Sequence, residues 1–180
     1  IVVCALSQRF NIIYVHHHSI AKIQKICLFE IFFVPLQSKI LNTYTMKNAQ
    51  IINGHRIASD RITELGDNEI FVFGSNIQGA HGGGAAWFAH KTFGAEWGVG
   101  EGLTGRTYAL PTMEGEVSMK HAVEHFIACA KQHPELTFLV TAVGCGIAGY
   151  TPHEVAPLFK EALTLENVYL PQVFVDVLGK

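Results

Sequence analysis

Glycine is concentrated in one part of the chain in a way that restricts the folds open to it. Residues 73–94, "FGSNIQGAHGGGAAWFAHKTFG", include the run Gly82, Gly83 and Gly84. Glycine loses more backbone freedom on folding than any other residue, so such a stretch needs a structural or functional reason. It begins at the end of an apolar run typical of a buried strand, residues 70–74, and continues into alanine-rich sequence that predicts a helix ending at Gly94.

A second unit of the same kind follows later in the chain. The apolar residues 137–144 predict a strand and lead into "VGCGIAGY" (143–150), after which Thr151 and Pro152 indicate the N-cap and first residue of a helix. A glycine loop between a strand and a helix directs free backbone N–H groups at an anion. Two such loops predict a ligand with phosphate in its middle and contacts at both ends. Neither loop fits GxGxxG with a downstream acid, and no Walker GxxxxGK[ST] sequence is present.

The remaining patterns alternate between strands and helices. They predict a strand at 106–111, a helix capped by Ser118 and ending at Gln132, a helix from Pro152 to Leu163, and a last strand or two within 168–178. Pro157 conflicts with a straight helix, so we expect a late start or a kink there. The alternation predicts one α/β domain with a mostly parallel sheet covered on both faces. Ligands of such sheets bind beyond the carboxyl ends of the strands, where both glycine loops lie.

The first 45 residues differ from the rest. They contain no glycine, no Asp and a single acid, Glu30, and the first methionine of the chain is Met46. Their apolar runs are too short for a membrane span, and no signal-peptide order is visible. We interpret residues 1–45 as read-through of sequence upstream of a start at Met46, with residues 46–180 as the domain. The alternative is an apolar arm that packs on the domain or on a partner.

Charge and cysteine usage exclude several classes of partner and compartment. The formal net charge is −2, and no basic patch or aromatic-basic stripe is present, so long nucleic acid is not an expected partner. A small phosphorylated ligand remains open, because backbone N–H groups bind phosphate without lysine or arginine. The four cysteines form no CxxC pair, which predicts reduced thiols in a cytoplasmic protein. Neither a membrane partner nor a cofactor is expected, and the oligomeric state is open.

Three motifs together resemble the macro domain, a family that binds ADP-ribose. They are "FVFGSNIQGAHGGGAAWFA" (71–89), "TYALPT" (107–112) and "AVGCGIAGYTPHEVAPLF" (142–159), in the family's order and approximate spacing. Across residues 70–159 the chain looks like a divergent macro-like domain. The resemblance implies a three-layer α/β/α sandwich with a mixed, mostly parallel sheet.

The resemblance also implies which residues touch ADP-ribose. Asn76 matches the family's asparagine that holds the distal ribose, and Ala148 stands where the family commonly has an aromatic residue, for which Tyr150 is the candidate substitute. Asp60 is the candidate for the acid that reads the adenine amino group, and Asp67 is its rival. The full candidate ligand-binding set is Asp60, Gly74, Ser75, Asn76, Gly82, Gly83, Gly84, Ala85, Gly144, Cys145, Gly146, Ile147, Ala148, Gly149 and Tyr150.

Several of these residues have competing interpretations. His81 is a candidate general base over the distal ribose; the alternative is a loop histidine that bonds the backbone. Asn76 is a candidate for orienting the ligand in catalysis, or else caps its own loop. Cys145 is expected to have a lowered thiol pKa beside the N–H dipoles, or to be a small tolerated residue. The H-x-x-E-H motif at 121–125 is interpreted as a solvated helix face, so no metal site is expected; "HHH" at 16–18 falls in the atypical first segment.

The expected function is therefore binding of ADP-ribose or a related nucleotide-diphosphate sugar, free or on a modified macromolecule. Hydrolysis of an ADP-ribosyl linkage would place water against the distal ribose C1, with catalysis by positioning rather than by a strong base. The alternatives are a non-catalytic reader or sequestering module, and a macro-like fold with another ligand.

Overall fold

The computed structural model describes residues 47–179. The interpretation of residues 1–45, the histidines 16–18, Cys4 and Cys27 lie outside these residues. Within the described residues, Cys129 and Cys145 are free thiols.

Seven strands form one mixed sheet in the order β1-β2-β7-β6-β3-β5-β4. The strands are β1 (Ala49–Ile52), β2 (His55–Ala58), β3 (Glu69–Ser75), β4 (Gly102–Thr104), β5 (Thr107–Pro111), β6 (Thr137–Val140) and β7 (Val168–Pro171). The five strands from β2 to β5 in this order run parallel, and β1 and β4 pair antiparallel at the two edges. The predicted α/β class with a largely parallel sheet is confirmed.

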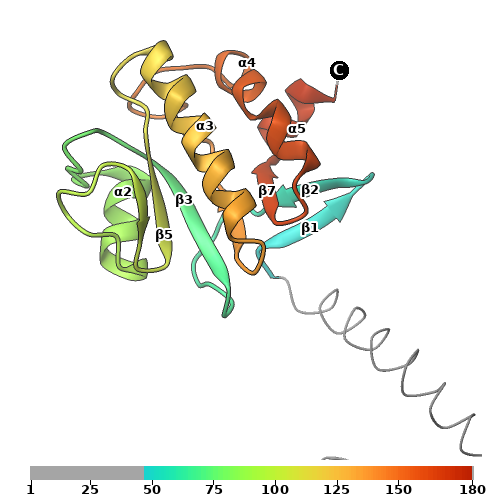
Figure 1. Cartoon of the computed structure of the whole chain (residues 1–180), viewed down its shortest axis with the longest axis horizontal. Coiled ribbons are helices and arrows are strands. Elements are labelled where there is room, and N and C mark those ends of the chain that lie inside the picture. Colours follow the sequence, from blue (N-terminus) through green and yellow to red (C-terminus); the bar gives the residue numbers. More distant parts are fainter. Residues whose placement is uncertain (1–46, 180) are drawn as a thin grey trace, which may run out of the picture. The chain divides into compact units, whose positions relative to one another are not determined.

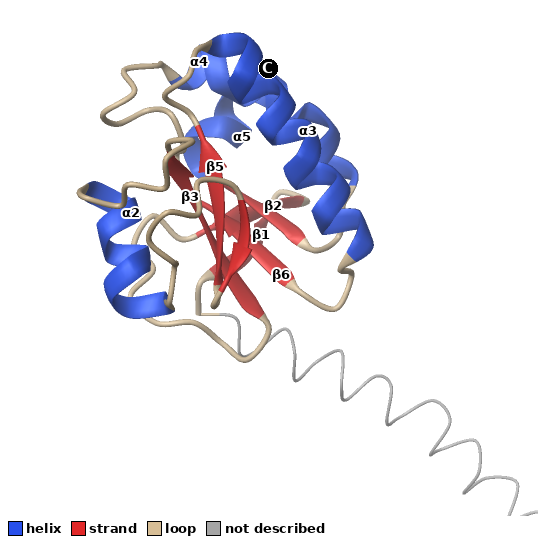
Figure 2. Cartoon of the chain, turned by 60° about the vertical axis from the view of Figure 1, so that its left-hand side comes forward, coloured by secondary structure: helices blue, strands red, loops and turns tan. Residues whose placement is uncertain are grey.

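Alternate residues of the strands enter two separate hydrophobic clusters. In β3, Val72 packs with α3 (Glu116–Gln132) and α5 (Gln172–Leu178) in one cluster. Its neighbours Phe71 and Phe73 pack with Phe93 of the π-helix η1 (Ala89–Phe93) in the other. Because successive side chains of a strand point to opposite faces, the two clusters lie on opposite faces of the sheet. Figure 2 shows α3 and α5 on one side of the strands and α2 (Gly84–Phe88) on the other.

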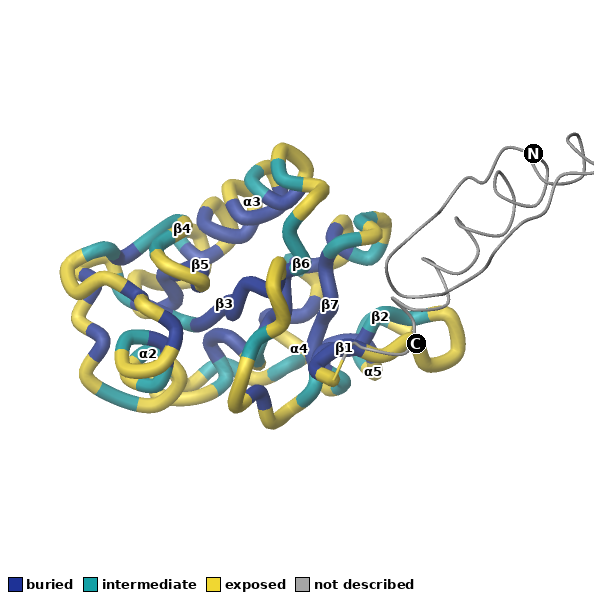
Figure 3. Tube along the Cα trace, turned by 90° about the horizontal axis from the view of Figure 1, so that it is seen from below, coloured by how far each residue is buried: buried dark blue, intermediate teal, exposed yellow. Residues whose placement is uncertain are grey.

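The central strands are buried on both faces. Val72 of β3 lies opposite Tyr108 of β5 and Val140 of β6. Six of the seven β3 residues are buried, and Figure 3 shows β3 and β7 as dark blue, buried segments within an exposed outer shell. This burial explains why the sequence of β3 is a continuous apolar run rather than an alternating one.

The helices correct two predicted boundaries. α3 begins at Glu116 after Gly115, so Ser118 lies inside its first turn and does not cap it. Residues 172–178, predicted as strand, form α5. There Phe174 packs against Phe159, with ring centroids 5.5 Å apart, so tertiary packing overrides the strand propensity of the valines. Figure 1 shows α5 following β7 at the C-terminal end of the chain.

The predicted cap after the second glycine loop is present, and the helix that it starts changes type before Pro157. Thr151 caps α4 (Pro152–Val155) with a capping box, in which the Thr151 N–H donates to Glu154 Oε2 at 2.7 Å. This hydrogen bond and that of the Thr151 hydroxyl hold the pKa of Glu154 below its ordinary value. From Ala156 the chain continues as a 3₁₀ helix, η2 (Ala156–Thr164), which accommodates Pro157 at its first turn.

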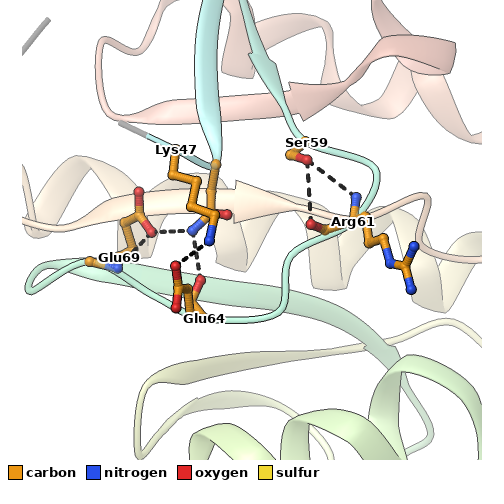
Figure 4. A network of polar contacts seen from close by, with 7 residues as sticks. Lys47, Ser59, Arg61, Glu64 and Glu69 are labelled. Carbon is orange, nitrogen blue, oxygen red and sulfur yellow. Dashed lines mark hydrogen bonds and ion pairs between the residues drawn. The ribbon is translucent and has the colours of Figure 1, made fainter. Parts of the chain in front are cut away.

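Polar contacts fix the segment that joins β2 to β3 (Figure 4). The buried carboxylate of Glu69 accepts hydrogen bonds from Asn48 Nδ2 at 2.7 Å and from the Gly66 N–H at 2.8 Å. Lys47 pairs with Glu64, and the Arg61 N–H donates to Ser59 Oγ at 3.3 Å. The segment therefore has a defined path from the carboxyl end of β2 to the start of β3.

Candidate functional site

A pocket of about 250 Å³ lies beyond the carboxyl ends of β3, β5 and β6, at the edge where the sequence predicts it. It is lined by Gly74, Ser75, Asn76, Ala80, Gly83, Gly84, Ala85, Ala86, Thr112, Met113, Thr141, Ala142, Val143, Gly144, Gly146, Ile147 and Ala148. The three resembling motifs, far apart in sequence, thus contribute to one cavity. Of the candidate set, the lining omits Asp60, Gly82, Cys145, Gly149 and Tyr150.

The loop after β3 is held by the side chain of Asn76. Its Nδ2 donates to the Ala80 carbonyl at 2.9 Å, and its Oδ1 accepts from the Ala80 N–H at 3.0 Å. The loop-capping interpretation of Asn76 is therefore correct. The residue also lines the pocket, and an amide has a second proton and a second lone pair for a ligand.

A second segment, which sequence reasoning did not single out, packs behind this loop. The Gly98 N–H donates to the Gly79 carbonyl at 2.9 Å. A Cβ on Gly79, whose φ is +63°, would lie 2.3 Å from the Val99 nitrogen, and one on Gly100 would lie 2.4 Å from the Asn76 carbonyl oxygen. Two backbones therefore cross where no side chain fits. The only sequence signal is "GVGEG" at 98–102.

His81 belongs to this crossing and not to the pocket. Its side chain is fully buried, bonds the Glu96 carbonyl through Nε2 at 3.0 Å, and packs edge-on against Phe73 and Trp97. Burial lowers the pKa of His81, and its Nδ1 has no hydrogen-bond partner within residues 47–179. The backbone-bonding interpretation is correct, and the general-base assignment is wrong, because a base must reach the reacting atoms.

The second loop presents consecutive free N–H groups. Its turn is closed by two hydrogen bonds of 3.0 Å, from the Gly149 N–H to the Gly146 carbonyl and from the Tyr150 N–H to the Gly144 carbonyl. Within the described part of the chain, the N–H groups of Gly146, Ile147 and Ala148 donate to no protein acceptor. All three residues line the pocket. Consecutive N–H groups of this kind form a concave site for an anion.

Gly144 and Cys145 anchor that loop to the core. Gly144 has a φ of +76°, and a Cβ there would lie 3.3 Å from both Met119 Sδ and Val155 Cγ2. Cys145 and Tyr150 pack against the core cluster of α3, so Tyr150 does not supply the missing aromatic wall. The lowered thiol pKa predicted for Cys145 is wrong: burial raises it, and the nearby Glu154 carboxylate raises it further.

The two loops approach each other across the pocket. A Cβ placed on Gly83 would meet Ile147 Cδ1 at 3.7 Å, so the Ile147 side chain reaches towards the first loop while remaining 82% exposed. A Cβ on Gly146 would meet nothing within 4 Å. Gly146 is therefore bare backbone with open space before it, whereas the Ile147 side chain lies before Gly83.

The floor of the pocket carries hydroxyl groups that sequence reasoning passed over. Thr141 Oγ1 donates to the Val72 carbonyl at 2.9 Å, and Thr112 Oγ1 lies 3.2 Å from the position of a Cβ on Gly74. Both threonines directly follow the apolar runs of β6 and β5, which is the only signal that could have identified them.

The topology separates Asp60 and Asp67, the two candidates for the acid that reads the adenine amino group. Asp60 follows β2, whose carboxyl end lies at the pocket edge, although the residue is exposed and outside the lining. Asp67 precedes β3 and so lies at the opposite edge of the sheet. Asp67 therefore has no place in a site at this pocket.

The lining is uncharged, and within residues 47–179 no group of three His, Cys, Asp or Glu side chains could hold a metal. In the H-x-x-E-H motif His121 bonds Glu124 at 3.1 Å and His125 bonds Glu101 at 2.8 Å on the exposed side of α3, as predicted for a solvated face. No helix in the described range could cross a membrane. Comparison with protein-family models, curated proteins and solved structures found no match to this chain.

Proposed function

We propose that the pocket binds ADP-ribose or a related nucleotide-diphosphate sugar, free or attached to a macromolecule, in a cytoplasmic protein. The observation that carries this proposal is the row of three unpaired N–H groups at Gly146, Ile147 and Ala148, in a pocket that Gly83 also lines. In keeping with it, the two helical layers and the mixed sheet would form a macro-like three-layer α/β/α sandwich.

In this proposal the diphosphate lies on the second loop. Backbone N–H groups neutralise an anion through aligned dipoles and make charge-assisted hydrogen bonds without a lysine or arginine. The distal ribose then lies against Gly83 and Gly84, whose missing side chains leave room for the ring. The second amide proton and lone pair of Asn76 are available to the ribose hydroxyls.

The lining favours binding over acid–base catalysis. No residue in it titrates near neutral pH, and His81 is buried behind the loop. A hydrolase would have to rely on a water positioned against the ribose by Asn76 and the bound diphosphate. The proposed activity is therefore that of a reader or sequestering module for ADP-ribose.

Calorimetric titration of the full chain with ADP-ribose tests the binding. Gly146→Glu should weaken it by about 100-fold or more, because a carboxylate would stand beside the diphosphate. The substitution suits the test because the glycine has an ordinary φ and open space around it. Val117→Glu is the matched control: it adds the same charge at a residue that is 73% exposed on α3 and outside the lining, and should bind as the wild type does.

Absence of ADP-ribose binding, or equal binding by both glutamate variants, would contradict the proposal. A second assay separates reader from hydrolase: incubation with an ADP-ribosylated protein should release no ADP-ribose above a blank. Release that is lost in Gly146→Glu would instead establish a hydrolase.

A further inference from the structure

The pocket is smaller than sites that enclose a whole drug-sized ligand. Its volume of about 250 Å³ lies below the roughly 300–1,000 Å³ of sites that enclose a drug-sized ligand. All its lining residues come from the ends of β3, β5 and β6 and from the segments that follow them. The pocket therefore encloses one end of such a ligand.

The floor is suited to the hydroxyl groups of a sugar. The hydroxyls of Ser75, Thr112 and Thr141 each donate to a backbone carbonyl, at 3.2, 3.4 and 2.9 Å respectively. With their protons committed, these oxygens offer lone pairs, so they accept hydrogen bonds. A sugar hydroxyl can donate to them, whereas a fully ionised phosphate has no proton to offer.

The donors lie at a different part of the same cavity. The free N–H groups belong to residues 146–148 of the second loop, and Ile147 among them is 82% exposed at the rim. A ligand with hydroxyls at one end and a phosphate next to them matches this arrangement. Its hydroxyls can donate to the serine and threonine oxygens, and its phosphate can accept from the N–H groups of the second loop. Ribose 5-phosphate, the distal half of ADP-ribose, has this arrangement.

Within residues 47–179, the lining of this pocket provides no comparable site for the base. The ends of β2 and β7 contribute nothing to the lining, and Asp60, which follows β2, is exposed and outside it. Recognition of a particular base needs hydrogen-bonding groups placed at its edge, and the ends of β2 and β7 bring none into this pocket.

From these observations we infer that the site recognises a terminal ribose phosphate and leaves the base of the nucleotide unread. The inference rests on the proposed function and deepens it: the ligand class becomes ribose 5-phosphate and any nucleoside diphosphate that ends in ribose. Recognition of this kind suits a module that receives ligands with different bases.

The two halves of ADP-ribose provide the test. Calorimetry on the full chain should find that ribose 5-phosphate binds within about tenfold of ADP-ribose. AMP should bind at least about 100-fold more weakly, because its adenine replaces the C1 hydroxyl and the enclosed volume leaves no room for it. GDP-ribose should match ADP-ribose within about threefold. Asp60→Ala should leave all these affinities unchanged.

Each result separates this inference from the proposed function. Tight binding of ADP-ribose with loss of affinity for ribose 5-phosphate, or with equal affinity for AMP, would overturn the inference and leave the proposed function in place. A tenfold loss of ADP-ribose affinity in Asp60→Ala would do the same. Failure of ADP-ribose, ribose 5-phosphate and GDP-ribose alike to bind would overturn both.

Discussion

Two neighbouring groups of glycines perform opposite roles in this protein. Gly79 and Gly100 stand where two backbones cross, and a Cβ on either would lie within 2.5 Å of main-chain atoms. Gly83 and Gly146 face the pocket; a Cβ on Gly83 would meet only Ile147 at 3.7 Å, and one on Gly146 would meet nothing within 4 Å. The first pair lacks side chains because the fold has no room, and the second pair keeps a surface open. Only the second pair is available to a ligand.

The largest expected effect lies at the crossing. Gly79→Ala should lower the free energy of unfolding by more than about 3 kcal/mol, because the new methyl would overlap the Val99 nitrogen and the residue would be held at a φ of +63°. Urea denaturation followed by circular dichroism measures the loss. If Gly79→Ala unfolds at the same urea concentration as the wild type, the crossing does not constrain this position.

A smaller effect should follow the titration of His81. Burial lowers the pKa of His81 in the folded state, whereas in the unfolded chain the pKa keeps its ordinary value of about 6.5. The unfolded chain therefore binds the proton more readily than the folded protein does. Its contribution to stability is therefore complete above pH 6.5 and is lost as the pH falls towards the folded pKa, by at most about 1.4 kcal/mol per pH unit. Denaturation midpoints measured between pH 7 and pH 5 report the slope.

His81→Phe, which keeps a ring between Phe73 and Trp97 but cannot titrate, should show a shallower slope than the wild type. Identical slopes would mean that other groups carry the pH dependence.

The loop cap should contribute about 1 kcal/mol. Asn76→Ala removes both hydrogen bonds to Ala80, at 2.9 and 3.0 Å, from an only partly buried site, so each is worth a modest net amount. The same variant should weaken ADP-ribose binding, because the loop forms one wall of the pocket. Thermal denaturation and calorimetry on one sample compare the two effects, and unchanged binding would restrict Asn76 to a structural role.

The smallest effect on stability is expected at the open glycine. Gly146→Ala should change the free energy of unfolding by less than about 1 kcal/mol, because the methyl meets nothing and reduces only the freedom of the unfolded chain. Set beside Gly79→Ala, it isolates the difference between a crowded and an open glycine. Comparable destabilisation of the two variants in the same denaturation assay would show that the distinction is wrong.

The sequence predicts the position of the site well and its inward-facing groups poorly. Apolar runs place β3, β5 and β6, and strand direction brings both glycine loops to one edge, so the pocket is found where expected. The local pattern does not tell which way a loop side chain turns. His81 turns in beside Phe73, and Cys145 packs against the core cluster of α3, because burial is favourable there, and this depends on elements distant in sequence.

The same limit explains the missed elements. Residues 172–178 have the composition of a strand, yet they form a helix, because β7 ends at Pro171 and, within the described residues, pairs with no strand beyond it. Phe174 instead has an aromatic partner on η2. The segment 96–100 has no periodic pattern at all, and its role follows only from the backbone that crosses it. Contacts of this kind are tertiary in origin, so no single stretch of sequence encodes them.

The uncharged lining has a consequence for how such a site would behave in a cell. When peptide dipoles hold an anion, no bound cation is displaced and no side chain has to gain or lose a proton for binding. A second pKa of about 6 belongs to phosphate monoesters. The diphosphate of ADP-ribose is a diester and lacks that proton, so its occupancy should stay constant between about pH 6 and pH 8. The protein would report the amount of its ligand and be insensitive to the acidity of its surroundings.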